Sequence, residues 1–180
     1  KGFCGSTETS QPDMDKNTHQ DIEGNVTALN HTLTGLTPGK TYYVRAYAVN
    51  EAGVTYNSHA HFTTDAVNKP TFGNISVTDV AITTAKVTAR ISSNGNQEIT
   101  RKGFYWSSTN HEPGENDQVK AIEGTGDQMV LNMSDLKSST TYYVRAFATN
   151  SQGTTLSNIT SFTTAIDPVP GDGDMGNPDK

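Results

Sequence analysis

Hydrophobic and polar residues alternate along several short stretches in the second half of the chain. A period of two places every second side chain on one face of a β-strand, whereas a helix repeats about every 3.6 residues. The alternation is clearest in Val87-x-Ala89-x-Ile91, Met129-x-Leu131-x-Met133 and Tyr142-x-Val144-x-Ala146-x-Ala148. This pattern predicts half-buried strands near residues 74–79, 85–92, 100–108, 117–122, 128–134, 140–150 and 156–164.

Turn-forming sequences separate these predicted strands. Glycine, proline and asparagine favour tight or left-handed backbone, and they occur together between the alternating stretches. The turns are Asn94-Gly95, Glu112-Pro113-Gly114, Gly124-Thr125-Gly126 and Asn150-Ser151-Gln152-Gly153. Strands at this spacing in a unit of about 95 residues are typical of a two-sheet Greek-key sandwich.

An internal repeat divides the chain. Residues 41–64 recur as residues 141–164, with 13 of 24 positions identical, and KGFC at 1–4 matches KGFY at 102–105. The first copy has no counterpart of residues 70–101. We therefore predict an all-β protein of two tandem immunoglobulin-like β-sandwiches, the first of which lacks its opening strands. The expected divisions are a partial repeat at 1–64, a linker at 65–70, a complete repeat at 71–164 and a Pro/Gly/Asp-rich linker or tail at 165–180.

The motif Leu36-x-Pro38-x-x-x-Tyr42-x-Val44-x-Ala46-x-Ala48-x-Asn50-x-x-Gly53 resembles strand F of fibronectin type III domains and the segment before it. The sequences GFYWSS, YYVRAFATN and SFTT are similar to fibronectin type III-like tandem repeats of bacterial cell-surface and secreted proteins. This resemblance covers nearly the whole chain before the tail. It implies an extracellular or bacterial cell-surface location, although the chain carries no such signal of its own.

Tyr42 and Tyr142 stand where this pattern places a tyrosine corner. We expect each ring to pack inward and each hydroxyl to bond to the backbone a few residues upstream, with a backbone acceptor as its partner.

The missing strands of the first repeat should expose apolar residues that include Val44, Ala46 and Leu33. A patch of this kind is rarely left uncovered in water. We expect the polypeptide to continue upstream and supply the strands itself. The alternatives are that a cut fragment stays bound, or that another chain acts as strand donor by β-augmentation.

Strand geometry sends an aromatic-Arg-aromatic stripe to the outer face of each repeat. The stripe consists of Tyr43, Arg45 and Tyr47 in the first copy and Tyr143, Arg145 and Phe147 in the second, with Trp106 extending it from the neighbouring strand. Cross-strand packing is the favoured interpretation. Ligand binding to a glycan or protein at a cell surface is the alternative.

Charge and composition exclude several other functions. The chain has 13 Lys and Arg residues against 19 Asp and Glu residues with no basic stripe, so nucleic acid is not an expected partner.

The single cysteine, Cys4, aligns with Tyr105 in a predicted strand and is expected to be a buried packing thiol. His59-x-His61 lacks a third ligand, and the acidic segment from Asp13 to Asp21 lacks the closing glutamate of a calcium loop. No metal or other cofactor is predicted.

The chain contains no phosphate-binding glycine loop and no nucleophile-base set, so it is not expected to be an enzyme. The expected function is a structural or interaction module, a spacer or adhesion segment whose partners are other domains of the same polypeptide. The alternatives are a carbohydrate-binding module that uses the aromatic stripe and a surface-assembly subunit completed by strand complementation.

Overall fold

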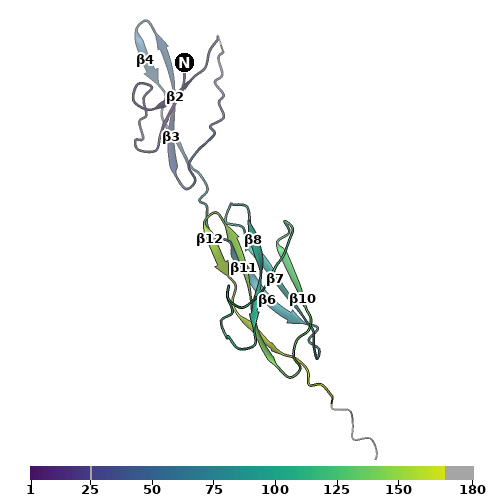
Figure 1. The fold of residues 1–180 in the computed structure, drawn as a ribbon. Coiled ribbons are helices and arrows are strands. Elements are labelled where there is room, and N and C mark those ends of the chain that lie inside the picture. The colour runs from purple at the N-terminus through teal and green to yellow at the C-terminus, as the bar shows by residue number, and fades with distance from the viewer. Residues whose placement is uncertain (25, 169–180) are drawn as a thin grey trace, which may run out of the picture. The chain divides into compact units, whose positions relative to one another are not determined.

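The computed structural model describes residues 1–24 and 26–168, and in these ranges the chain forms strands and loops without a helix (Figure 1). The chain divides into two compact units, residues 1–67 (unit 1) and the part that begins at Asn68 (unit 2). The boundary falls inside the predicted linker at 65–70. In the described residues, no helix could cross a lipid bilayer.

Unit 2 is a sandwich of two antiparallel sheets. One sheet has the order β10-β7-β6, and the other has the order β12-β11-β8-β9 with β13 also paired to β11. The strands are β6 (Thr71–Thr78), β7 (Ala85–Ser93), β8 (Arg101–Ser107), β9 (Gln118–Ala121), β10 (Gln128–Met133), β11 (Thr141–Asn150), β12 (Gly153–Leu156) and β13 (Thr160–Thr163).

The alternating residues named above form the core between these sheets. Val87, Met129, Val144, Ala146 and Ala148 are fully buried there, and each faces the opposite sheet. The expectation of an all-β immunoglobulin-like sandwich is thereby confirmed for this unit.

The last predicted strand, 156–164, is interrupted in the structure. The Ser157 side chain takes the place of a backbone partner: its Oγ accepts a hydrogen bond from the Ala146 N–H at 2.9 Å, while the Ser157 N–H donates to the Ala146 carbonyl at 2.9 Å. The strand therefore ends at Leu156 and resumes at Thr160, since a side-chain acceptor breaks the regular ladder.

Unit 1 contains a single sheet in the order β2-β1-β3-β4, with β5 paired to β3. Its strands are β1 (Gly2–Ser6), β2 (Thr18–Asp21), β3 (Thr41–Asn50), β4 (Gly53–Tyr56) and β5 (Ala60–Thr63). These correspond to β8, β9, β11, β12 and β13 of unit 2. Residues 28–33 align with β10 yet form no strand, because β10 is held by β7 and unit 1 has no counterpart of β7.

The connection between the units is attached at both ends. The Asp65 carbonyl accepts a hydrogen bond from the Gly39 N–H at 3.1 Å within unit 1. The Asn68 N–H donates to the Gly95 carbonyl at 2.8 Å within unit 2. In the predicted tail, the Ala165 N–H still donates to the Ala81 carbonyl at 3.0 Å, and residues 169–180 lie outside the described residues.

Candidate functional site

The outer face of the larger sheet in unit 2, which points away from the core, is itself packed. Phe147 is fully buried and stacks on Tyr105 with 4.4 Å between ring centroids. The Arg101 guanidinium lies 4.9 Å above the Phe147 ring on the same face. Phe147 therefore has no ring face free for a ligand, contrary to the predicted exposed stripe.

Glycines make this packing possible. A Cβ on Gly103 would lie 2.2 Å from the Lys120 carbonyl oxygen and 2.8 Å from the Phe147 ring, so a side chain there would displace the ring or the neighbouring strand. Gly2 has the same place in unit 1, where a Cβ would lie 2.8 Å from the Tyr47 hydroxyl.

Tyr143 and Arg145 are half-buried on this outer face of unit 2. The His111 ring, from the loop at residues 108–117, lies 4.3 Å from the Tyr143 ring, and Pro113 in the same loop is fully buried. The loop thus covers part of the sheet that alternation alone assigns to solvent.

Trp106 lies on the inner face, and its place in the predicted stripe is wrong. It is paired with Val144 and packs against the core, as Phe104 does two residues earlier. Residues two apart on a strand share a face, so Trp106 cannot extend a surface formed by Tyr143 and Arg145.

In unit 1 the corresponding residues are also engaged. The Tyr43 ring lies beside the rings of both His59 and His61, at centroid distances of 5.8 and 5.9 Å. The Arg45 guanidinium lies 4.5 Å above the Tyr56 ring, and its Nε donates to the Asn57 carbonyl at 3.0 Å. These contacts are of the kind expected if the stripe residues pack against neighbouring strands.

Tyr47 is 2% exposed, so the expectation that it faces solvent is also wrong. Its hydroxyl donates a hydrogen bond to the Asp21 carboxylate on β2. Burial, followed by this bond and the carboxylate charge, raises the pKa of Tyr47 to about 12.

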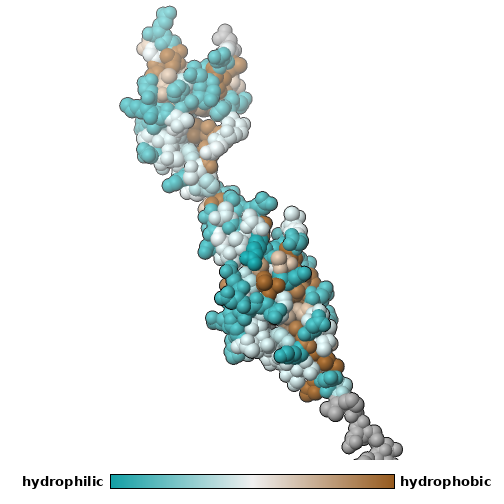
Figure 2. Space-filling view, in the orientation of Figure 1, coloured by the Kyte–Doolittle hydropathy of each residue, from teal (hydrophilic) through white to brown (hydrophobic). Residues whose placement is uncertain are grey.

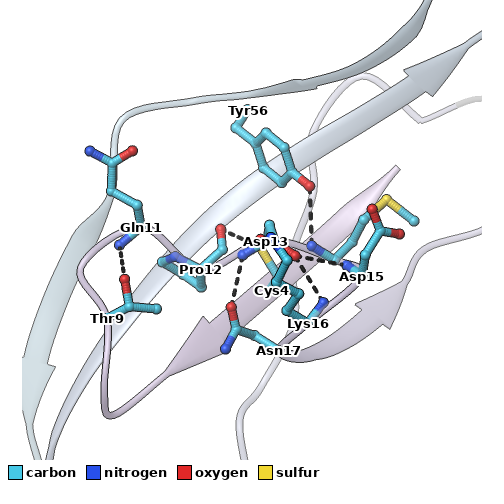
Figure 3. A network of polar contacts seen from close by, with 10 residues as sticks. Cys4, Thr9, Gln11, Pro12, Asp13, Asp15, Lys16, Asn17 and Tyr56 are labelled. Carbon is cyan, nitrogen blue, oxygen red and sulfur yellow. Dashed lines mark hydrogen bonds and ion pairs between the residues drawn. The ribbon is translucent and has the colours of Figure 1, made fainter.

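Cys4 is buried in the place that Tyr105 holds in unit 2, and its thiol donates to the Pro12 carbonyl at 3.3 Å. Burial raises the pKa of the Cys4 thiol. A higher pKa reduces the fraction of reactive thiolate, as expected for a packing cysteine. Figure 3 shows the loop that covers it, where the Tyr56 hydroxyl accepts a hydrogen bond from the Met14 N–H at 3.1 Å.

The acidic side chains of this loop form hydrogen bonds within the loop. Asp13 Oδ1 accepts hydrogen bonds from the N–H groups of Asp15 and Lys16, and Asn17 Oδ1 accepts one from the Asp13 N–H at 3.0 Å (Figure 3). The bonds from Lys16 and Asp15 to the carboxylate, the backbone bond from Lys16 first, lower the pKa of Asp13. Among the described residues, no group of three or more His, Cys, Asp or Glu side chains is arranged to hold a metal ion.

The two corner tyrosines lie at equivalent places. The Tyr142 hydroxyl accepts a hydrogen bond from the Lys137 N–H at 3.0 Å, and the Tyr42 hydroxyl accepts one from the Thr37 N–H at 2.9 Å. In both cases the backbone group donates and the hydroxyl accepts. The prediction that each hydroxyl would bond to a backbone acceptor is therefore wrong. Tyr142 is buried and stacks on Phe162, whereas Tyr42 is half-buried.

The inner face of unit 1 is open. A groove of about 470 Å³ lies between the sheet and residues 31–37, lined by Phe3, Tyr42, Val44, His31 and Leu33 among others. Figure 2 shows hydrophobic residues on the surface around a hollow in this unit. The stripe residues of unit 1 do not line this groove, whereas the corner residue Tyr42 does. Val44 and Leu33, two of the residues expected to be exposed by the missing strands, also line it.

Comparisons with known proteins bear on the fold alone. No family model matches the chain, and no curated protein matches it. The sixth fibronectin type III domain of human fibronectin type III domain containing protein 3 is 23% identical, covering 61% of this chain and 98% of that chain, with a TM-score of 0.44. The sensor domain of the anti-sigma factor RsgI4 in Pseudobacteroides cellulosolvens is 16% identical, covering 56% and 99%, with a TM-score of 0.44. The third fibronectin III domain of human KIAA0343 protein is 19% identical, covering 57% and 86%, with a TM-score of 0.40.

These structural neighbours are fibronectin III-like domains. At such identities and TM-scores they carry no argument about function, and the fold assignment rests on the strand order of this chain. The fold is an immunoglobulin-like β-sandwich.

Proposed function

We propose that the chain is a non-catalytic structural and interaction module, a spacer or adhesion segment of a larger bacterial surface or secreted protein. The observation that carries this proposal is the use of the outer-face side chains. Phe147 is enclosed by Tyr105 and Arg101, and the Tyr143 ring contacts the His111 ring. Residues that a ligand site would present are thereby engaged in holding the sheet and its loop together.

The joint between the units supports a spacer. Only Ala66 and Val67 separate Asp65, bonded within unit 1, from Asn68, bonded within unit 2. A short connection of this kind suits modules that follow one another directly along a polypeptide, as in a spacer. The partners are then other domains of the same polypeptide. The bacterial-surface or extracellular location is proposed from the resemblance of the repeat motifs.

A carbohydrate-binding module is the competing function, and the outer face offers little for it. Stacking on a sugar ring needs a free aromatic face, and Phe147, Tyr47 and Trp106 are buried or turned toward the core. Tyr43 and Tyr143 are half-buried on the outer face, and Trp106 is half-buried on the inner face.

Alanine variants of Tyr143 and Trp106 test the two functions against each other. Retention on immobilised polysaccharides and unfolding in urea are measured for the 180-residue chain and both variants. We expect no retention of any of them and a loss of stability in both variants, because each ring packs within unit 2. Retention of the wild type that Tyr143→Ala abolishes without a loss of stability would overturn the proposal.

A further inference from the structure

Asn94 and Gly95 form the single Asn-Gly dipeptide of the chain. This dipeptide is especially prone to deamidation, because glycine has no side chain to shield its backbone nitrogen. In that reaction the Gly95 nitrogen gives up its proton and attacks the carbonyl carbon of the Asn94 side chain. Ammonia leaves, and a five-membered succinimide forms. Water then opens the ring at either carbonyl, so the product is aspartate or isoaspartate, and isoaspartate carries the side-chain methylene in the backbone.

The structure holds both reacting groups in hydrogen bonds just after β7. The Gly95 N–H donates to Ser93 Oγ at 3.1 Å, and Asn94 Oδ1 accepts a hydrogen bond from the Asn96 N–H at 3.0 Å. Gly95 is also buried, which limits the access of solvent base to its nitrogen. The nucleophile and the carbonyl that it would attack are therefore both restrained.

The Asn150 side chain fixes the same turn from the end of β11. Its amide donates to the Asn94 carbonyl at 2.9 Å and to the Asn68 carbonyl at 2.7 Å, and Asn150 is 4% exposed. The Asn68 N–H in turn donates to the Gly95 carbonyl at 2.8 Å. Ring closure rotates the backbone on both sides of the Asn94–Gly95 peptide bond. These bonds must therefore break in a local opening before the succinimide can form.

The folded turn has no room for the isoaspartate product. A Cβ on Gly95 would collide with the Asn68 carbonyl oxygen, and Gly95 has a φ of +71°. The additional backbone methylene of an isoaspartate at residue 94 must displace one of these two segments. Asn68 is the first residue of unit 2, so the segment that moves is the one that attaches unit 2 to the connection before it.

We propose that Asn94-Gly95 is a latent deamidation site that the Asn150 side chain protects, and that its conversion to isoaspartate detaches Asn68 from unit 2. Folded unit 2 keeps Asn94 intact. Each local opening of the turn exposes Asn94 to a change that closing does not reverse. This inference goes beyond the spacer role and does not depend on it.

The first test incubates the 180-residue chain in mildly alkaline buffer with and without urea, and peptide mass spectrometry locates the amide-to-acid conversion at residue 94. We expect conversion to be at least about tenfold slower without urea, because it requires local opening. Asn150→Ala should speed conversion in native buffer about tenfold, since the turn loses both amide bonds. Asn50→Ala is the same substitution in unit 1 and should leave the rate at Asn94 unchanged.

A second variant covers the case in which Asn150→Ala fails to fold, which the fluorescence of Trp106 in unit 2 reports. Ser93→Ala removes the acceptor of the Gly95 N–H from an exposed position, and it should speed conversion about threefold. Equal conversion rates of the wild type in native buffer and in urea would overturn the proposal. An unchanged rate in both folded variants, or in Ser93→Ala alone if Asn150→Ala is unfolded, would also overturn it.

The second test measures hydrogen exchange in the isoaspartate form, separated from the intact chain by chromatography. We expect fast exchange at the Asn68 and Gly95 amides of this form. Asn94→Asp is the matched control and should keep slow exchange, because its backbone has the normal length and its carboxylate still accepts from the Asn96 N–H. Slow exchange at Asn68 in the isoaspartate form would show that conversion does not detach this segment.

Discussion

The ring of Phe147 lies on the ring of Tyr105 with 4.4 Å between centroids, on the side of the sheet that points away from the inter-sheet core. Unit 2 therefore buries aromatic surface on both sides of one sheet. Unit 1 repeats the arrangement with Tyr47 and Cys4 in these two places, and they are its buried non-proline hydrophobic residues among those described. This outer packing is what remains to stabilise unit 1 while its inner face is open.

Replacing Phe147 by alanine is expected to lower the free energy of unfolding of unit 2 by about 3–5 kcal/mol, the usual cost of deleting a fully buried aromatic ring. Urea unfolding followed by fluorescence measures this directly, since Trp106 is the single tryptophan and lies in unit 2. Tyr105→Phe serves as the control because it keeps the stacked ring. A loss below about 1 kcal/mol in Phe147→Ala would contradict a packed outer face.

Removing the Tyr142 hydroxyl is expected to cost about 1–2 kcal/mol, because the Lys137 N–H would lose its acceptor in a part-buried hydrogen bond to a buried ring. Tyr42→Phe is the matched control, and its effect on unit 1 should be smaller since Tyr42 is half-buried and its bond from the Thr37 N–H is exposed to water. Urea unfolding of both variants gives the comparison. Equal losses in the two units would show that burial does not determine how much this hydrogen bond contributes to stability.

Alternation predicted the strands of unit 2 because one face of each is buried in a continuous core. Val87, Ala89 and Ile91 have no other way to leave water than to face the opposite sheet. The same rule placed Phe147 in solvent, because alternation contains no information about the loop at 108–117 that folds back over the outer face.

Other differences have separate physical causes. Trp106 could have been placed correctly, since it is in phase with Phe104, an apolar residue of the same strand. The break after Leu156 depends on a Ser157 hydroxyl replacing a backbone group, which a hydroxyl-rich sequence does not distinguish from an ordinary strand. The contact between Tyr47 and Asp21 joins residues of two strands whose register no local pattern fixes.

Asn150→Ala is expected to destabilise unit 2 by about 1–3 kcal/mol, because the carbonyls of Asn68 and Asn94 both lose a buried donor. Asn50→Ala should leave the unfolding of unit 1 nearly unchanged, since the Asn50 amide is exposed. Hydrogen exchange at Asn68 and Gly95 offers a local reading of the first variant. If exchange there stays slow in Asn150→Ala, the side chain does not hold the segment before β6.

Unit 1 is expected to lose stability in alkali because of Tyr47. Its pKa of about 12 in the folded state exceeds the usual value of 10 for tyrosine, so folding favours the neutral phenol. The resulting stabilisation is complete below pH 10 and disappears as the pH rises through about 12. In the wild type, the urea midpoint of unit 1 should be lower at about pH 11 than at about pH 8. The methyl resonances of Val44 report the unfolding of this unit. The midpoint should fall less in Tyr47→Phe, which is less stable at the lower pH because it lacks the bond to Asp21. Parallel losses in the two proteins would assign the alkaline effect to other groups.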